Sequence, residues 1–406
     1  MNSKHVVRYL DRTTPPHIST LILLAGISAL VMNIFLPSLP AMSEHFQVEY
    51  SFMQLSVALY LGVSGGMQLF VGPLSDKFGR RPVIITGIVL FCLATLGCIF
   101  APNAEVFMVF RMLQAVIAAG MVLSRAVVRD MVPADQAASM IGYVTMGMSL
   151  VPMFGPATGG ILQETFGWRS NFWFLFILGV LLLILVWRDM GETAPKSTNT
   201  VIGQFREYPE LLLSPRFWGY CLASAFGSGA FFAYLGGAPF VGISVYDLDP
   251  AELGAYFMAP GIGYFLGNFL TGRYSGRIGV NKMVLTGTLI ATCGPMIAIA
   301  LSLSGMASAI TFFGSMLFVG IGNGLTLPSA NAGMLSVRPH LAGTASGLGG
   351  TMTIGGGAAL SALAGVLLKP ESTDLPLLML MLTTCVLSTI AILLVIRREK
   401  RMGLQI

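Results

Sequence analysis

The sequence has few charged residues for its length. Only 10% of its 406 residues are Asp, Glu, Lys or Arg, whereas 55% are apolar. A water-soluble domain carries about 25% charged residues, so this composition excludes a protein whose whole surface faces water. Apolar runs of about 20 residues, long enough to cross a bilayer as helices, recur along the chain. The sequence therefore predicts an all-α protein embedded in a membrane.

Groups that usually perform enzyme chemistry are also scarce. The five cysteines lie within apolar runs and lack the spacing of metal ligands. The four histidines lie in polar segments or at the ends of apolar runs, and no carboxylate falls near the middle of a run. Without a deep cluster of acid, base, nucleophile or metal ligands, we expect no enzyme, and we predict no metal, cofactor or nucleic-acid partner.

Hydropathy predicts twelve membrane spans in two groups of six, separated by the longest polar stretch. The first group covers residues 19–40, 51–72, 82–101, 106–129, 137–162 and 169–188. The second group covers residues 215–240, 252–272, 282–303, 306–330, 341–367 and 374–396. We therefore expect an N-terminal six-helix half at 1–188, a cytoplasmic linker at 189–214 and a C-terminal six-helix half at 215–406.

The basic residues set the expected orientation. With the N-terminus inside the cell, all but three of the 23 Lys and Arg residues lie in or beside cytoplasmic segments. Arg169 and Lys369 lie outside, and Arg111 lies within a span. This bias follows the positive-inside rule, so both termini are expected in the cytoplasm. The same rule explains the net charge of +5 without a nucleic-acid partner.

An internal repeat at an offset of 200 residues supports two related halves. Four positions of one segment match four of another, each between the second and third spans of its half: Gly72, Ser75, Lys77 and Gly79 correspond to Gly272, Ser275, Arg277 and Gly279. Repeated halves of this kind place a substrate site near the middle of the membrane, at the interface between them. The repeat predicts two pseudo-symmetric halves.

The segment Gly72-Pro-Leu-Ser-Asp-Lys-Phe-Gly-Arg-Arg-Pro82 closely resembles the cytoplasmic loop signature of the major facilitator superfamily. Glycine permits a tight turn and close packing, and a carboxylate can pair with a cation. The resemblance implies a latch between the halves in the outward-facing state, formed by Gly72, Asp76, Gly79, Arg80 and Arg81. Asp130 is the expected partner of Arg80. The second copy has lost both the Asp and the Arg, so an asymmetric latch is predicted.

Two further elements fall within spans. Arg111-Met-Leu-Gln114-Ala115 resembles the Arg-x-x-Gln-Gly element of the family, which implies a role for Arg111 in proton coupling. An arginine inside the membrane is costly unless it faces a cavity or a partner, although it could instead snorkel to the outer interface. The fifth span carries Gly147, Pro152, Gly155, Pro156, Gly159 and Gly160, which resembles the element of drug–proton antiporters. Proline bends such a helix and glycine lets a neighbour approach closely.

Shorter matches narrow the resemblance to antiporters of the bicyclomycin and chloramphenicol resistance (Bcr/CflA) type. They are Leu36-Pro-Ser-Leu-Pro40, Arg125-Ala-Val-Val-Arg-Asp130, Gly167-Trp-Arg169 and Ala342-Gly-Thr-Ala-Ser-Gly347. The resemblance implies a protein of the bacterial inner membrane that exports drugs by proton antiport. It also implies membrane lipids and protons as partners, no cofactor and a functional monomer.

One position departs from the pattern of these relatives, which usually carry an aspartate in the first span. Asn33 stands there, and asparagine cannot take up a proton near neutral pH. Three accounts stay open. Asp130 or Glu164 could titrate into a water-filled cavity, Arg111 could exchange partners, or coupling could be lost or use another ion.

The substrate pocket is expected to be apolar with a few polar handles. The candidates for polar contacts are Asn33, Gln68, Arg111, Tyr234, Tyr256, Asn268 and Asn331, with Phe231, Phe232 and Met258 as soft apolar surface. A pocket without a carboxylate favours neutral or zwitterionic compounds over lipophilic cations, because nothing neutralises a cation there. An uncoupled or differently coupled transporter of a sugar or an amino acid is the alternative, favoured by the missing acid.

Overall fold

The computed structural model describes residues 7–132, 150–194, 211–338, 342–369 and 371–403, with five isolated positions between 133 and 149. Every regular element in these residues is a helix, and ten segments are long and apolar enough to cross a membrane. The predicted all-α membrane fold is confirmed. Of the other two predicted spans, 137–162 lies partly outside the described residues. The span predicted at 252–272 is helical but more polar than the ten.

The first half of the chain contains ten helical segments in the described part. They are α1 (Ile18–Asn33), η1 (Leu36–Ser38), α2 (Leu39–Phe46), α3 (Tyr50–Phe78), α4 (Arg80–Ile99), α5 (Ala104–Leu113), η2 (Gln114–Ala118), α6 (Ala119–Met131), α8 (Val151–Phe166) and α9 (Arg169–Asp189). The first span is divided because Pro37 and Pro40 lack an N–H, so the helix that begins at Ile18 cannot continue unbroken through them.

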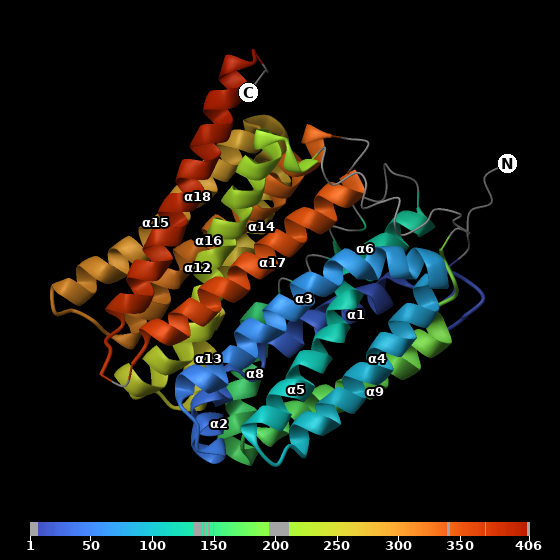
Figure 1. Ribbon diagram of the computed structural model, residues 1–406, viewed down its shortest axis with the longest axis horizontal. Helices are drawn as coiled ribbons and strands as arrows, with labels where there is room; N and C mark the ends of the chain where they lie inside the picture. Colours follow the sequence, from blue (N-terminus) through green and yellow to red (C-terminus); the bar gives the residue numbers. More distant parts are fainter. Residues whose placement is uncertain are drawn as a thin grey trace.

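The helices after the predicted linker make up the predicted second half. Its helices are α12 (Pro215–Phe240), the π-helix η3 (Val241–Val245), α13 (Pro250–Tyr256), α14 (Met258–Ile278), α15 (Val280–Leu303), α16 (Ala309–Val337), α17 (Ala342–Leu367) and α18 (Leu375–Arg401). Figure 1 shows the early helices, blue to green, on one side of the bundle and the late helices, yellow to red, on the other. The proposed linker at 189–214 lies largely outside the described residues, so the boundaries of the halves stay a prediction.

The repeat has a backbone counterpart at two glycines. Gly79 ends α3 with φ 96° and Gly279 ends α14 with φ 86°, so both halves turn at the same position of the repeat. Only glycine adopts such angles readily. The predicted loop from residue 72 to 82 is therefore mostly the last turns of α3. Gly72 lies inside that helix, and a Cβ there would meet nothing within 4 Å, so the close packing expected of it is absent in this conformation.

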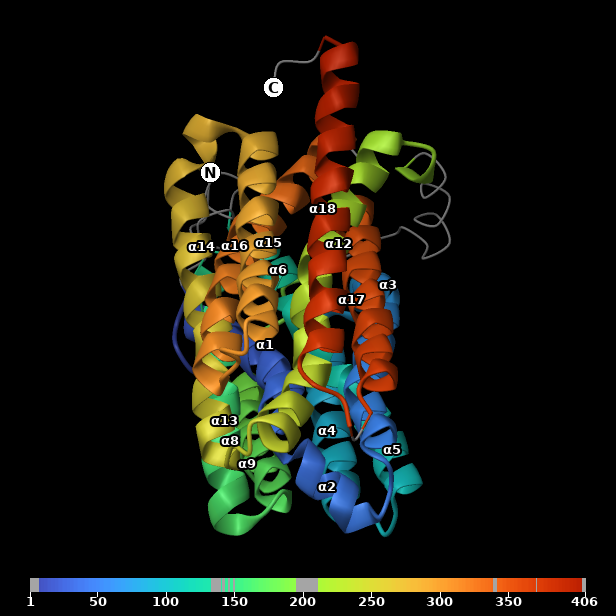
Figure 2. The ribbon, with the colours of Figure 1, turned by 90° about the vertical axis from the view of Figure 1, so that its left-hand side faces the viewer.

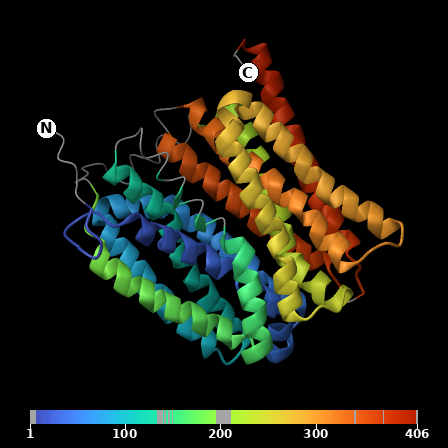
Figure 3. The same cartoon turned by 180° about the vertical axis from the view of Figure 1, so that it is seen from behind.

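The helices run roughly along one axis. Figure 2 shows α18 ending at one end of the bundle, which we call the terminal end, and α2, α8 and α13 at the opposite, or far, end. The most extensive contacts between the halves are those of α3 with α17 and of α8 with α13 and α14. Figure 3 shows the green α8 beside the yellow α13 at the far end.

The buried carboxylate of Asp189, at the end of α9, binds the segment just before α1 and the start of α1. The Asp189 carboxylate accepts hydrogen bonds from the backbone N–H groups of Leu10 (2.7 Å) and His17 (2.9 Å) and from the Thr20 hydroxyl (2.6 Å). Asp189 and Thr20 have no exposed surface. Three donors satisfy the buried charge, which would otherwise be costly.

The second half has a matching tie at Glu399 near the end of α18. Its carboxylate accepts from the Arg216 guanidinium at 2.5 Å and 2.9 Å, from the Tyr220 hydroxyl at 3.1 Å and from the Asn281 amide. Thr20 and Tyr220 are 200 residues apart, which is the offset of the loop repeat. In both halves a carboxylate at the end of the last helix therefore binds the start of the first helix.

Candidate functional site

Arg111 lies inside the first half and is fully buried. It is seven residues into α5, which corresponds to a depth of about 10 Å at roughly 1.5 Å per residue. One terminal nitrogen donates to Gln114 Oε1 at 2.8 Å, and the other donates to the carbonyl oxygen of Val31 at 3.0 Å. Val31 lies in the last turn of α1, where carbonyl groups lack partners within the helix. The break in the first span thus supplies an acceptor for the arginine.

Two aromatic rings enclose the guanidinium. The Arg111 Cζ atom lies 4.2 Å from the ring centre of Phe35 and 4.2 Å from that of Tyr60. A cation between two aromatic faces is stabilised by both, more so where water is excluded. No carboxylate forms an ion pair with Arg111 in the described part of the chain. Its charge is held by neutral oxygens and rings, and its Nε has no hydrogen-bond partner there.

Asn33 ends α1 two residues after Val31. Its amide nitrogen donates to the Ala29 carbonyl at 2.9 Å, whereas its Oδ1 is buried without a partner. Buried polar atoms are seldom left unpaired, and each one calls for an explanation. Asn33 and Arg111 therefore leave an unused acceptor and an unused donor close to the break in the first span.

The predicted antiporter helix packs closely on both halves. A Cβ on Gly159 of α8 would overlap the carbonyl oxygen of Ile34, just beyond α1, and a Cβ on Gly160 would overlap that of Pro250 in α13. Gly254 of α13 faces α8 in return, with a Cβ there 2.5 Å from the Pro156 carbonyl oxygen. Glycine is the residue that permits such close contact between helix backbones. Gly155 lies on the α1 side, and of Pro152 only the helical backbone is described.

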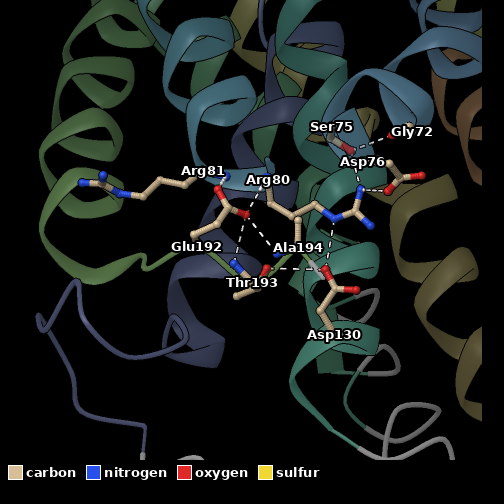
Figure 4. A network of polar contacts seen from close by, with 9 residues as sticks. All are labelled: Gly72, Ser75, Asp76, Arg80, Arg81, Asp130, Glu192, Thr193 and Ala194. Carbon is tan, nitrogen blue, oxygen red and sulfur yellow. Dashed lines mark hydrogen bonds and ion pairs between the residues drawn. The ribbon is translucent and has the colours of Figure 1, made fainter. Parts of the chain in front are cut away.

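The latch residues form a network at the terminal end of the first half (Figure 4). The Arg80 guanidinium lies 2.6 Å from the Asp76 carboxylate and 3.0 Å from that of Asp130. It also donates to the Ser75 hydroxyl, which in turn donates to the Gly72 carbonyl at 2.8 Å. All of these partners belong to α3 and α6. The expected partner of Arg80 is thus present, and in this conformation the described part of the network does not reach the second half.

Glu192, which caps α4, was not among the residues predicted from the sequence. Its carboxylate accepts from the backbone N–H groups of Arg80 at 2.8 Å and Arg81 at 3.2 Å, as Figure 4 shows. The first N–H groups of a helix lack partners within it and attract negative charge. A Cβ on Gly79 would lie 2.9 Å from the Glu192 carboxylate carbon, so the glycine also makes room for this cap.

Asp130→Asn is expected to destabilise the protein by about 1–3 kcal/mol, because Arg80 loses one charged partner in a largely buried place. The measurement is the thermal unfolding midpoint of the purified protein in detergent. Glu164→Gln is the control, since that exposed carboxylate lacks an ion pair in the described structure. An equal midpoint for Asp130→Asn and wild type would contradict the assigned pairing.

Two of the other substrate candidates, Tyr234 and Tyr256, share an aromatic cluster around Phe313, and the remaining ones lie elsewhere. Tyr234 is buried among aromatic rings, with its centroid 4.9 Å from that of Phe257, and Tyr256 stacks on Phe313 at 5.1 Å. The Tyr234 hydroxyl has no hydrogen-bond partner in the described structure. Gln68 faces Gly350 of α17, Asn268 donates to the Tyr264 carbonyl within its own helix, and Asn331 is exposed. Of the three coupling candidates, Arg111 is deep, Asp130 is in the latch, and Glu164 is exposed near the end of α8.

A polar contact between the halves near the far end had no signal in the sequence. The Gln54 amide donates to the carbonyl and hydroxyl oxygens of Ser361, the latter at 3.1 Å, and the Tyr50 hydroxyl donates to the Gly236 carbonyl at 2.9 Å. Gly236 and Gly365 surround the Gln54 side chain, and a Cβ on either would overlap it. Finding this contact from sequence would have required knowing that α3 pairs with α17.

The sequence that forms this arrangement of helices matches a known protein family. The family model of the Major Facilitator Superfamily matches residues 21–362. The chain belongs to the major facilitator superfamily. It is a multi-pass membrane transporter and not an enzyme. Its fold is also found in the crystal structure of a peptide transporter, with a TM-score of 0.78 at 12% sequence identity, covering 96% of this chain and 95% of that one.

Relatives confirm the predicted type of superfamily member. An uncharacterised transporter of the superfamily from Bacillus subtilis, YdgK, is 31% identical, covering 91% of this chain and 92% of the relative. The chloramphenicol resistance protein of Pseudomonas aeruginosa is 29% identical over 88% and 85% of the two chains. A bicyclomycin resistance protein homologue from Haemophilus influenzae is 27% identical over 94% and 96%.

Proposed function

We propose that the chain exports small amphipathic drugs from the bacterial cytoplasm by alternating access, coupled to proton entry. The observation that carries this proposal is the position of α8. Its glycines touch the break after α1 on one side and α13 on the other. A helix in close contact with both halves can couple the state of the substrate region to the closure of the far end. The names of the drug-resistance relatives support the same direction of transport.

The proposed orientation places the terminal end in the cytoplasm, as the distribution of Lys and Arg favours. The far end would then face the periplasm. The contacts of Tyr50 and Gln54 with the second half lie near the far end, and the latch at the terminal end, as far as its residues are described, involves only α3, α4, α6 and the chain after α9. This combination is the one expected of an inward-facing state, ready to take a substrate from the cytoplasm.

The proposed substrates are neutral or zwitterionic. Every acidic residue in the described ranges lies in a loop or within about two turns of a helix end, so none faces the middle of the bundle. A lipophilic cation would find no opposite charge there, and Arg111 would repel it. The unpaired Asn33 Oδ1 and Tyr234 hydroxyl are polar groups that a neutral compound could engage when the site opens.

Coupling is proposed to involve Arg111, Asp130 and Glu164. Asp130 is the candidate that connects coupling with conformation, because its carboxylate pairs with Arg80 of the latch at 3.0 Å. Glu164 offers a second carboxylate near the far end. The alternative, a transporter of a small metabolite without proton coupling, is favoured by the absence of a carboxylate at mid-depth in the described spans.

The test is accumulation of labelled chloramphenicol in a pump-deficient bacterium that expresses the chain. We expect expression to lower accumulation and a protonophore to restore it. Asp130→Asn and Glu164→Gln are then compared at equal expression, and the variant that abolishes protonophore-sensitive export identifies the titrating group. Accumulation that expression leaves unchanged, for neutral and cationic compounds alike, would reject drug export in favour of the metabolite alternative.

A further inference from the structure

A hollow lies at the terminal end, beside the last turn of α9. Its volume is about 400 Å³, and its lining consists of Leu10, Asp11, Arg12, Thr13, Trp187 and Arg188. None of these residues belongs to the proposed substrate region, and of the six only Trp187 is described in contact with a latch residue, through its carbonyl to Arg81. The segment before α1 forms one wall and α9 forms the other.

The wall formed by residues 10–14 is held in place by specific bonds. The buried carboxylate of Asp189 binds the N–H of Leu10, and the Gly191 N–H donates to the Thr14 carbonyl at 3.1 Å. Leu10 has φ 62°, a conformation that costs a non-glycine residue about 1–3 kcal/mol and persists only where surrounding bonds enforce it. The hollow is therefore a formed feature of this fold and not the gap beside a loose tail.

The hollow is rich in unpaired positive charge. Arg12 and Arg188 are exposed, and in the described structure neither forms an ion pair with a carboxylate. Arg81 extends from α4 toward α9, as Figure 4 shows, and donates to the Trp187 carbonyl at 3.2 Å. A third guanidinium thus lies beside the same turn.

One acid, Asp11, also lines the hollow. Its carboxylate accepts from the Thr13 N–H at 3.0 Å and from the Thr13 hydroxyl at 2.6 Å. These bonds, together with the charge of Arg8, lower the pKa of Asp11. The Asp11 carboxylate therefore stays ionised and bonded to Thr13. The two arginines that line the hollow still leave it with a net positive charge.

The hollow lies at the expected level of the lipid headgroups. The preceding turns of α9 expose Leu181 (56%) and Ile184 (47%), which is the outer face of a lipid-contacting helix. Trp187 follows on that helix, is 51% exposed, and has the Arg12 guanidinium 6.0 Å from its ring centre. Tryptophan is enriched at the boundary between lipid and water, where its ring meets the headgroups.

We propose that this hollow binds the phosphate headgroup of an anionic phospholipid of the same leaflet. Arg12 and Arg188 would hold the phosphate, and Leu10 and Trp187 would cover the glycerol and the upper part of the acyl chains. Basic pockets beside transmembrane helices recognise anionic lipids by this combination of charge and apolar contact. The apolar lining favours a lipid over a free phosphate ion. This inference depends on the membrane location of the chain and not on what it transports.

The experiment uses the purified full-length protein and native mass spectrometry, with dioleoyl phosphatidylglycerol and dioleoyl phosphatidylcholine as probes. The double variant Arg12→Ala with Arg188→Ala is expected to bind phosphatidylglycerol at least tenfold more weakly, since each arginine contributes roughly fivefold. Phosphatidylcholine binding should not change. The matched control is Arg397→Ala with Arg398→Ala, two exposed arginines at the same end of the bundle.

The control should retain wild-type binding within twofold, and Arg12→Lys with Arg188→Lys should retain most of it because the charges remain. Three results would overturn the proposal. They are unchanged phosphatidylglycerol binding in the alanine variant, an equal loss in the Arg397 and Arg398 control, and displacement of the lipid by an excess of inorganic phosphate. The last result would identify a site for a soluble anion.

Discussion

Arg111→Ala is expected to abolish drug export and to lower stability. The substitution leaves the Gln114 Oε1 and the Val31 carbonyl without their donor in a buried place, at a cost of about 1–3 kcal/mol each. It also empties the space between the rings of Phe35 and Tyr60. The measurement is efflux of labelled chloramphenicol from proteoliposomes at matched protein content, together with the unfolding midpoint.

Arg111→Lys separates the charge from the geometry. Lysine keeps the positive charge, but a compact ammonium group cannot stack as a plane between two rings while its separate nitrogens donate to two acceptors. We expect the lysine variant to fold and to lose most of its transport. Transport at the wild-type rate in this variant would show that only the charge matters, and that the ring sandwich has no part in the transport cycle.

Gly160→Ala is expected to drive the far ends of the halves apart. A Cβ at this position overlaps the Pro250 carbonyl and lies 3.0 Å from the Ala251 Cα, and both belong to the other half. Overpacking of this kind costs about 1–3 kcal/mol, which corresponds to a shift of roughly fivefold to a hundredfold between two conformations. The variant should therefore populate the described conformation less and should transport more slowly.

The shift can be measured by electron–electron distance distributions between spin labels that replace Phe166 and Asp247, two exposed far-end residues in different halves. Cys293, the exposed cysteine, is first replaced by serine. Gly66→Ala is the matched control, because a Cβ at Gly66 meets nothing within 4 Å. A distance distribution in Gly160→Ala identical to that of the control would rule out α8 as a sensor of far-end closure.

The features that depend on residues close together in the sequence could be predicted from it. Hydropathy predicted the helical segments because each must satisfy its own backbone hydrogen bonds in lipid. The repeat placed Gly79 and Gly279 at equivalent positions, and both adopt positive φ. The pairing of Arg80 with Asp130 was predictable because the expected layout puts both residues at the cytoplasmic ends of spans in the same half.

Contacts that join distant helices could not be predicted from one sequence. Phe35 and Tyr60 are ordinary apolar residues until the break in the first span brings them to Arg111. The donors to Asp189 are mostly backbone N–H groups, which carry no sequence signal. Of the proposed substrate residues, Tyr234 and Tyr256 meet at Phe313, whereas the others lie apart, because choosing polar residues span by span does not show which faces of the helices meet.

The ties at Asp189 and Glu399 have a mechanical consequence. Each joins the first and last helix of its half, and both lie at the terminal end, which is the open end in the inward-facing state proposed above. Helices joined in this way cannot separate from one another individually, so each half should move as a rigid body. The change of conformation must then occur at the interface between the halves. This interface runs along α3 with α17 and α8 with α13, where glycines allow the helix backbones to slide past one another.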